Sequence, residues 1–386
     1  MKVLHINVSA INDKFYLGFF ELLKNRNIEQ TVFVPFSNKE YGMEEQKDTI
    51  LNYESKSINI QLLPIKNKQD RIFYFRKIGK YEKYLLKRLT ISDYELLHAH
   101  SLYSDGGVAY KIYKDFGVPY IVAVRSTDTE IFMKYFKWLN KFAKHILENA
   151  AKIIFISPDL KNKTIESLYK GERRKISWMD KCEIIPNGVN DFWLENKYEC
   201  KELRNKNAVN ILQVSRLNKG KNVDKSVLAI KQLRDKGIDA NFYVAGSGTE
   251  ESNIKKLIRK LNLEKYVHLL GFVSNKNDLL NLYRKCDIFL MPSVGETFGI
   301  SYIEAFTQGL PVIGVKGTGI GGYFEDGKIG FFVNTPTPIE IADSIEKIMK
   351  NYESLSRDAI GLIEKFNWKN IIDIYMDLYK KTAGTR

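Results

Sequence analysis

The sequence predicts an α/β protein made of two Rossmann-like domains, each built on a doubly wound parallel sheet. The chain has 386 residues, which is more than one ordinary hydrophobic core organises. Short runs that are apolar throughout alternate with longer stretches of helical periodicity, the pattern of a parallel sheet covered on both faces. This alternation occurs twice, before and after a polar stretch at 195–208.

The strands and helices follow from these runs. In the first half, strands are predicted at 2–8, 30–36, 95–100, 119–125 and 152–157, with helices at 15–26, 103–116 and 132–150 between them. In the second half, strands are predicted at 209–217, 240–246, 266–272, 287–293 and 311–315. A further helical pattern occupies 366–381.

The domain boundary is predicted near "EIIPNGVNDFW" (183–193), where Pro186, Asn187 and Gly188 are typical turn residues. The domains are therefore placed at 1–187 and 188–366. Ligands of open parallel sheets bind beyond the carboxyl ends of the strands, so a site is expected in the cleft between two such domains.

Composition limits the class of protein. A content of 44% hydrophobic and 27% charged residues is typical of a soluble globular chain. The net charge of +14 suits nucleic acid, anionic lipid or phosphorylated substrates, but a lysine-rich solvated surface gives the same charge. No nucleic-acid recognition motif is present, so no nucleic acid is expected as a partner.

The expected location is the cytoplasm. No leader is expected, because "MKVLHINVSA" enters a strand pattern directly, and no apolar run approaches the roughly 20 residues that span a bilayer. Cys182, Cys200 and Cys286 lack metal-ligand spacing and cannot all pair, which favours reduced thiols.

Two loops that follow strands of the second domain are candidates for ligand binding. In "VSRLNKGKNV" (214–223), Arg216 and Lys221 combine a planar fork with a mobile point charge, which suits a diphosphate. In "VAGSGTEE" (244–251), Gly246 permits a tight turn or close approach of a ligand, and the turn is the preferred interpretation.

The segment "LMPSVGETFGISYIEAFTQGLPVIG" (290–314) is the most informative. A helix is predicted from about residue 300 to 308, with Gly309 placed to end it. Its first amides, at Phe298 and Gly299, form an anion site. Glu296 and Glu304 would repel a phosphate unless they bind hydroxyl groups. A nucleotide sugar offers both phosphates and hydroxyls.

The ordered motifs resemble those of retaining glycosyltransferases of family 4, which have the GT-B fold. They are "IPNGVN", "SRLNKGKN", "VAGSGTEE", "LLGFV", "YRKCDIFLMPSVGETFGISYIEAFTQGLPVIG" and "FNWKNIIDIY". Glu296 and Glu304 match that family's E-x(7)-E motif. The resemblance covers about 184–381 strongly, whereas the first half matches mainly in architecture.

The resemblance implies roles for individual residues. Arg216 and Lys221 would stabilise the donor diphosphate, Glu296 would hold the donor sugar, and Glu304 would bind ribose hydroxyls. The amides of Phe298 and Gly299 would bind the distal phosphate, with Phe272 and Val273 near the nucleobase. Neither glutamate would be a nucleophile. The C-terminal helix, 367–386, would cross back to the N-terminal domain.

Transfer without a metal or other cofactor is expected. The sequence has no D-x-D motif, which many glycosyltransferases of the other major fold use to hold a divalent ion. No group of His, Cys and Asp residues has metal-ligand spacing along the chain.

The first domain departs from the family pattern. Many members have a histidine after the fourth strand, where this chain has Arg125 followed by Asp128, and Arg125 is proposed to replace that histidine as a hydrogen-bond donor. His98 and His100 alternate onto one side of the preceding strand. A buried position is expected for His98, whereas His100 fits the cleft and the core equally. The segment 9–18 lacks the usual Gly-Gly pair, which leaves the acceptor geometry undefined.

Two basic and aromatic segments favour peripheral association with an anionic membrane. The segment 131–152 is predicted as one helix with an apolar stripe of Phe132, Tyr135, Leu139, Phe142 and Ile146 and a stripe of lysines. The segment 65–89 mixes basic and aromatic residues. The alternative is that the apolar stripe packs on the sheet and the lysines are merely solvated.

The predicted function is transfer of a hexose or N-acetylhexosamine, with retention, from a UDP- or GDP-linked sugar to a cell-envelope glycan such as capsule, lipopolysaccharide or a lipid-linked glycan. A nucleotide-sugar epimerase of the same fold and a non-catalytic nucleotide-binding partner subunit are the alternatives. The combination of Arg216, Lys221, Glu296 and Glu304 argues against both.

Overall fold

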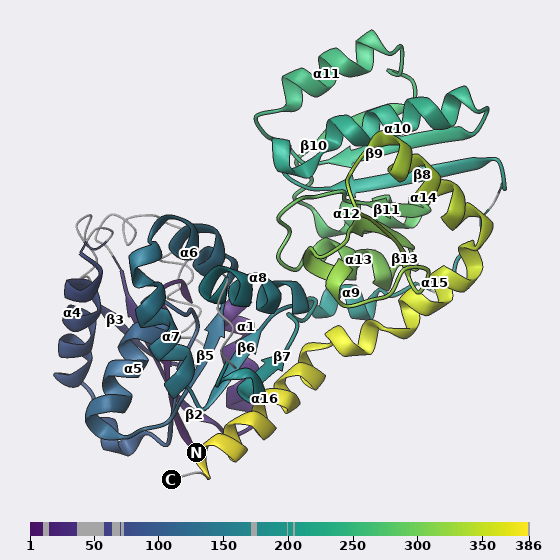
Figure 1. The fold of residues 1–386 in the computed structure, drawn as a ribbon. Coiled ribbons are helices and arrows are strands. Elements are labelled where there is room, and N and C mark those ends of the chain that lie inside the picture. Colours follow the sequence, from purple (N-terminus) through teal and green to yellow (C-terminus); the bar gives the residue numbers. More distant parts are fainter. Residues whose placement is uncertain are drawn as a thin grey trace. The chain divides into compact units, whose positions relative to one another are not determined.

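The structure is a computed structural model that describes residues 1–10, 15–36, 58–63, 70, 73–170, 176–198, 200–203 and 205–384. The chain divides into two compact units, Met1–Pro186 with Lys369–Arg386, and Asn187–Trp368 (Figure 1). Each unit is built on one parallel sheet, which confirms the predicted α/β class with two Rossmann-like sheets.

The first unit contains a seven-stranded sheet in the order β3-β2-β1-β4-β5-β6-β7. From edge to edge the strands are Asn59–Leu63, Glu29–Pro35, Lys2–Ile6, Leu96–Ala99, Tyr120–Val124, Lys152–Phe155 and Cys182–Ile184. Neighbouring strands are parallel, and His5 of β1 lies opposite His98 of β4. The two rings therefore project from the same face of the sheet.

Helices cover both faces of this sheet. They are α1 (Phe15–Asn25), α4 (Tyr74–Leu86), α5 (Ser104–Phe116), α6 (Met133–Tyr135), α7 (Asn140–Asn149), α8 (Pro158–Tyr169) and α16 (Trp368–Ala383). Phe19 of α1 and Tyr375 and Tyr379 of α16 contact the histidine face, whereas Gly106 of α5 packs against Val122 on the other. The C-terminal helix thus packs on the first sheet, as predicted.

The second unit contains a six-stranded sheet in the order β10-β9-β8-β11-β12-β13. These strands are Val267–Gly271, Asp239–Ala245, Ala208–Val214, Ile288–Leu290, Val312–Val315 and Gly330–Val333. Its helices are α9 (Asp191–Glu195), α10 (Val223–Asp235), α11 (Glu251–Lys260), α12 (Lys276–Lys285), α13 (Ile300–Thr307), α14 (Pro338–Lys350) and α15 (Tyr352–Gly361). Ile211 packs in the core beneath α10 and α14, and Phe289 contacts rings of α12 and α13.

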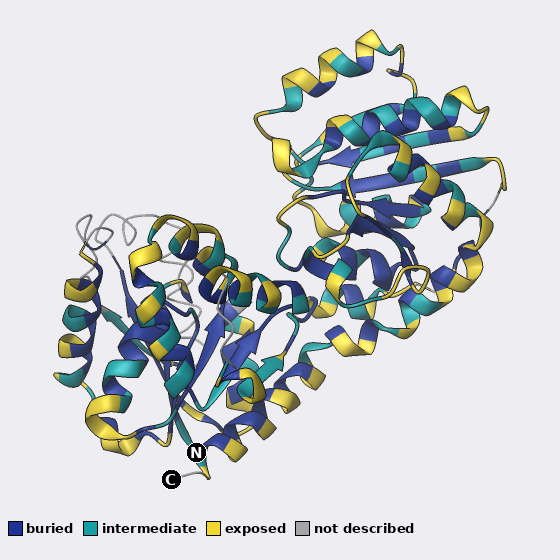
Figure 2. Cartoon of the chain, in the orientation of Figure 1, coloured by how far each residue is buried: buried dark blue, intermediate teal, exposed yellow. Residues whose placement is uncertain are grey.

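Burial follows this layering. The central strands of both sheets are dark blue in Figure 2, while the outer faces of the helices are exposed. Among the described helices, none has the length and apolar character needed to cross a bilayer.

Three strands were not predicted, namely β3, β7 and β13. All three lie at sheet edges, and each has five residues or fewer. A short edge strand has one neighbour and leaves a weak apolar signal in the sequence.

The prediction of one helix over 131–152 is wrong. A π-helical turn at Asp128–Phe132 leads into α6, the backbone leaves helical geometry at Phe136, a 3-10 turn follows at Lys137–Leu139, and α7 begins at Asn140. Phe132 stacks on Tyr103 with ring centroids 4.7 Å apart, whereas Phe142 contacts Tyr110 of α5. Contacts with different partners on either side of the break override the helical periodicity.

Candidate functional site

The candidate residues of the second unit gather at one edge of its sheet. The loops after β8, β9, β10 and β11 begin at Ser215, Gly246, Phe272 and Met291, at the carboxyl ends of parallel strands. This edge is where open parallel sheets bind ligands. The predicted Arg216, Lys221, Gly246, Phe272, Val273, Glu296, Phe298 and Gly299 all lie in these loops, and Glu304 lies in the helix that follows the last of them.

Lys221 and Glu296 form an ion pair that the sequence did not predict. The Lys221 Nζ atom lies 2.6 Å from Glu296 Oε2, and the two side chains are 19% and 17% exposed. The backbone fixes both partners, because Asn222 Nδ2 donates to the carbonyl of Pro292 and the amide of Val294 donates to the carbonyl of Gly220. The loops after β8 and β11 are therefore held together, and Lys221 balances the charge of Glu296.

Arg216 is the second cation at this edge. Its side chain is exposed and forms no hydrogen bond or ion pair with the other described residues. Its backbone, in contrast, is fixed, because the amide of Leu217 donates to the carbonyl of Ser247 at 2.9 Å. The guanidinium thus remains available to an anionic ligand.

Gly246 and Gly248 allow the loops after β8 and β9 to meet. A Cβ atom at Gly246 would lie 1.9 Å from the carbonyl oxygen of Ser215, and one at Gly248 would lie 2.3 Å from that of Leu217. Such separations exclude any side chain. The close packing explains both glycines as turn residues, which was the preferred interpretation of this segment.

The helix α13 begins at a glycine that no other residue could replace without strain. Gly299 has φ 78° and ψ 75°, and a Cβ atom there would lie 2.6 Å from the Tyr302 ring. Tyr302 is itself held, since its hydroxyl donates to the carbonyl of Met291 at 2.7 Å. The helix ends at Thr307, and Gly309 adopts φ 70°, so the predicted helix and its terminator are confirmed.

Glu304 occupies an environment that disfavours its charge. Burial raises the pKa of its carboxyl group from 4.5 to about 7, although the Tyr283 hydroxyl, Lys276 and the Trp193 indole partly oppose this shift. The Tyr283 hydroxyl lies 3.0 Å from Glu304 Oε2. The carboxyl group is therefore oriented, and it keeps its proton to a higher pH than an ordinary glutamate does.

Phe272 and Val273 line a surface pocket of about 490 Å³ between the end of β10 and α12. Phe272 is 76% exposed, which is unusual for a phenylalanine unless its ring has a partner to stack on. Leu270, Asn275 and Asp278 complete the wall near these residues.

A glycine-rich segment after β12 was missed. Residues 317–322 have the sequence "GTGIGG", and a Cβ atom at Gly319 would lie 3.0 Å from both the Glu296 Cγ atom and the Phe298 carbonyl oxygen. The segment therefore packs against the loop that carries Glu296. Four glycines in six positions, shortly after a strand, are a signal in the sequence that was overlooked.

In the first unit, Arg125 and Asp128 fix the loops that follow β4 and β5. Asp128 accepts hydrogen bonds from the amides of Leu102, Tyr103 and Arg125, and burial raises the pKa of its carboxyl group to about 6. Arg125 Nε donates to the carbonyl of His100 at 3.0 Å. The sequence predicted Arg125 as a ligand donor, and the structure also gives it this internal contact.

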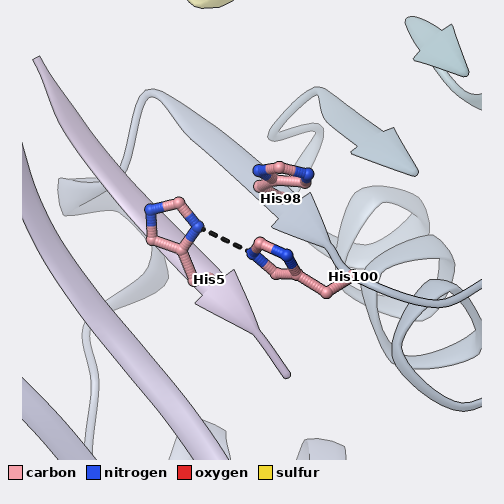
Figure 3. Close-up of side chains that lie close together, drawn as sticks. All are labelled: His5, His98 and His100. Carbon is pink, nitrogen blue, oxygen red and sulfur yellow. Dashed lines mark hydrogen bonds between the residues drawn. The ribbon is translucent and has the colours of Figure 1, made fainter. Parts of the chain in front are cut away.

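His98 and His100 lie on the same side of β4, as alternation predicted. Their rings stack with centroids 4.0 Å apart, and the side chains are 0% and 3% exposed. His98 is buried as expected. His100, which the sequence fitted equally to the cleft and to the core, lies in the core. His5 joins them, with Nδ1 3.1 Å from His100 Nε2 (Figure 3). Spacing along the chain could not show this group, because His5 comes from a different strand.

Exposed aromatic rings gather on two neighbouring segments of the first unit. Phe73 and Phe75 at the start of α4 are 54% and 53% exposed, and Tyr135 and Trp138 are 67% and 57% exposed. The Phe75 and Trp138 rings lie 6.0 Å apart, which brings the segments together. We call these four residues the aromatic face. Exposed basic side chains on the same segments are Arg76, Lys134, Lys137 and Lys141.

Comparison with protein families matches both halves of the chain. Residues 18–191 match the model described as Glycosyltransferase Family 4, and residues 195–360 match the model described as Glycosyl transferases group 1. The two matches follow one another along the chain and fall almost entirely within the first and second structural units.

Individual relatives agree with these matches. An uncharacterized glycosyltransferase of Methanocaldococcus jannaschii is 27% identical over 344 residues, covering 86% of this chain and 90% of that protein. The alpha-monoglucosyldiacylglycerol synthase of Acholeplasma laidlawii is 26% identical over 314 residues, covering 74% of each. Among solved structures, Anabaena Alr3699/HepE in complex with UDP has a TM-score of 0.71 at 17% identity, covering 99% of this chain and 100% of that one.

Proposed function

Because the chain is a family 4 glycosyltransferase of the GT-B fold, we propose that it transfers a hexose or N-acetylhexosamine from a nucleotide sugar to a cell-envelope glycan acceptor with retention of anomeric configuration. The observation that carries the proposal is the edge of the second sheet. There, the exposed Arg216, the ion pair of Lys221 with Glu296, and the glycine-initiated helix that carries Glu304 follow the neighbouring strands β8 and β11.

The donor diphosphate binds between Arg216 and the first amides of α13. Arg216 supplies a planar guanidinium that is not engaged elsewhere in the described chain, and the helix start supplies unpaired N–H groups and a positive dipole end. Lys221 adds a second positive charge as negative charge develops on the leaving diphosphate. Preorganised donors of this kind stabilise the transition state rather than the ground state.

The two glutamates bind hydroxyl groups in this proposal. Glu296 is held by Lys221 at 2.6 Å and accepts from the donor sugar. Glu304, oriented by Tyr283, accepts from the ribose hydroxyls, and Phe272 stacks on the base. A UDP donor is supported by the similarity to the Anabaena structure, which was solved with UDP. Chemistry proceeds without a metal ion, since the positive charge that a metal would supply comes from Arg216 and Lys221.

Two measurements test this assignment. In a thermal-shift panel of UDP-, GDP- and ADP-sugars, a bound donor raises the melting temperature by mass action. NMR of the product made from the stabilising donor is expected to show the anomeric configuration of the donor, with turnover undiminished by a chelator. Inversion contradicts the mechanism, and so does activity that falls with chelation while the melting temperature stays unchanged. Conversion of the donor sugar without any acceptor indicates an epimerase instead.

The acceptor is proposed to be presented at an anionic membrane. The aromatic face exposes four large rings, and the basic side chains of the same segments supply positive charge beside them. This combination suits insertion at the lipid headgroup boundary. The named activity of the Acholeplasma relative, synthesis of a glycosylated diacylglycerol, supports a lipid-linked acceptor.

Vesicle co-sedimentation tests membrane docking separately from transfer. Binding to anionic vesicles at low salt is expected, with weak binding to zwitterionic ones. Trp138→Ala and Phe75→Ala are expected to reduce it several-fold, since each ring buries apolar area. Phe116→Ala is the matched control, because Phe116 is 46% exposed at the end of α5, outside the aromatic face. Equal loss in the control, or no binding to anionic vesicles, refutes docking through this face.

A further inference from the structure

The histidine cluster of the first unit, His5, His98 and His100, has no part in the proposed transfer. Its members come from the adjacent strands β1 and β4, with His100 one residue past the end of β4. Their side chains are 0% to 3% exposed, and the rings gather on one face of the sheet (Figure 3). Rings of α1 and α16 enclose them, chiefly Phe20 and Tyr379.

The six ring nitrogens of the cluster are only partly satisfied. His5 Nδ1 and His100 Nε2 share one hydrogen bond of 3.1 Å, and His98 Nδ1 lies 2.6 Å from the Tyr379 hydroxyl. His5 Nε2, His98 Nε2 and His100 Nδ1 have no hydrogen-bond partner within the described part of the chain. Unpaired polar atoms in a core are rare and unfavourable, so the unpaired His98 Nε2 atom beside two further imidazole rings indicates a missing ligand.

We propose that His5, His98 and His100 bind one divalent transition-metal ion of the zinc class. One nitrogen from each ring lies within 4.8 Å of the others. Two nitrogens bound to a tetrahedral zinc at roughly 2.0–2.1 Å are about 3.3 Å apart. The observed 3.1 Å between His5 Nδ1 and His100 Nε2 is close to this value. Imidazole nitrogens are ligands that zinc, copper, nickel and iron accept.

The protons of the three histidines can rearrange to allow metal binding. The proton between His5 Nδ1 and His100 Nε2 moves to the other nitrogen of the same ring, which frees both lone pairs without a change in net charge. With the proton of His98 on Nδ1, that N–H group donates to the Tyr379 oxygen, and Nε2 is then the ligand atom. A metal-bound histidine commonly has such a partner on its second nitrogen.

Charges around the cluster set the expected strength of the site. Arg125 donates to the carbonyl of His100, and its positive charge disfavours a bound cation. Asp105 and Asp128 act electrostatically on Arg125 and partly offset it. With neutral ligands and a cation nearby, the site is expected to bind metal more weakly than one that includes a carboxylate or thiolate ligand.

The experiment uses the full chain, stripped with a chelator and dialysed. Titration with Zn²⁺ by calorimetry, and with Co²⁺ by visible absorption, is expected to show one ion per chain and a rise in melting temperature. His98→Gln and His100→Gln are expected to weaken binding at least tenfold. Tyr379→Phe keeps all three ligands and is expected to weaken it roughly 10–100-fold. It also covers the case in which a histidine variant fails to fold.

The chain contains matched controls, since it has two other histidines, His145 and His268. Their glutamine variants, and a Cys182→Ser, Cys200→Ser double variant, should bind zinc as the unsubstituted chain does. The proposal is overturned if the stripped chain takes up no stoichiometric ion, if His100→Gln or Tyr379→Phe keeps full affinity, or if the cysteine variant loses it. None of these outcomes depends on glycosyl transfer.

Discussion

Glu304→Gln is expected to stabilise the second unit at high pH and to leave its stability nearly unchanged at low pH. Burial raises the pKa of Glu304 from 4.5 to about 7, so the folded protein keeps the proton to a higher pH than the unfolded chain does. Stability is therefore lost as pH rises from about 4.5 to about 7, and the loss is complete above that. Glutamine fills similar space and does not ionise.

The magnitude follows from the shift in pKa. A shift of one unit corresponds to about 1.4 kcal/mol, so the shift from 4.5 to about 7 corresponds to about 3 kcal/mol. The difference in unfolding free energy between Glu304→Gln and the unsubstituted chain should thus grow by about 2–3 kcal/mol between about pH 5 and pH 8. A constant offset from the altered Tyr283 contact does not affect this growth.

Urea unfolding at the two pH values measures the difference. Trp193 is a suitable fluorescent reporter, because it is 2% exposed and its ring lies 5.2 Å from that of Tyr283. Glu264→Gln is the control, since Glu264 is exposed on the same unit. If the Glu304→Gln and unsubstituted curves remain parallel across pH, the carboxyl group is not held in an unfavourable environment and the reasoning fails.

Three further predictions concern the same sheet edge. Nucleoside diphosphate binding near pH 7 should release protons, because ionised Glu304 is the stronger acceptor for the ribose hydroxyls. Calorimetry in two buffers should show this release, and its persistence in Glu304→Gln would contradict the assignment. Arg216→Ala should lower turnover about 10²–10³-fold while the unfolding free energy changes by less than about 0.5 kcal/mol. Lys221→Ala should lower both turnover and the unfolding free energy, because Glu296 loses its partner. Near-normal turnover in either variant would exclude the diphosphate role. Gly299→Ala should lower the unfolding free energy, measured in denaturant, by about 2–4 kcal/mol. Gly271→Ala should lower it by about 1 kcal/mol, because Gly271 also has a positive φ but a Cβ atom there would meet open space. Equal losses in the two variants would rule out the clash with Tyr302.

The positions of the candidate residues in the fold were predicted better than the contacts between them. Arg216, Glu296 and Glu304 were placed correctly at strand ends and in α13, because these positions depend on local patterns of apolar runs, glycines and turns. The Lys221–Glu296 pair joins loops 75 residues apart in sequence. Its formation depends on β8 lying beside β11, an order that no local pattern encodes.

The histidines illustrate the same limit. Alternation along one strand correctly placed His98 and His100 on a common face. Adding His5 required knowing that β1 pairs with β4 and that His5 lies opposite His98 in the register. Likewise, the periodicity of 131–152 predicted one helix with Tyr135 in its apolar stripe, whereas the backbone leaves helical geometry at Phe136 and Tyr135 is 67% exposed. Long-range packing decided both outcomes.

The two cations of the proposed donor site differ in a way that bears on catalysis. Lys221 is held by Glu296 before any ligand arrives, so an entering diphosphate must share it with that carboxylate. Arg216 sits on a backbone fixed by the close approach of Gly246 and Gly248, yet its side chain is exposed. Arg216, Lys221 and Glu296 together carry one net positive charge, which is too little to neutralise a diphosphate. In the proposed mechanism, binding in the ground state is therefore modest, and Lys221 would gain its full interaction only as the departing diphosphate accumulates charge, which is the differential stabilisation that a transferase needs.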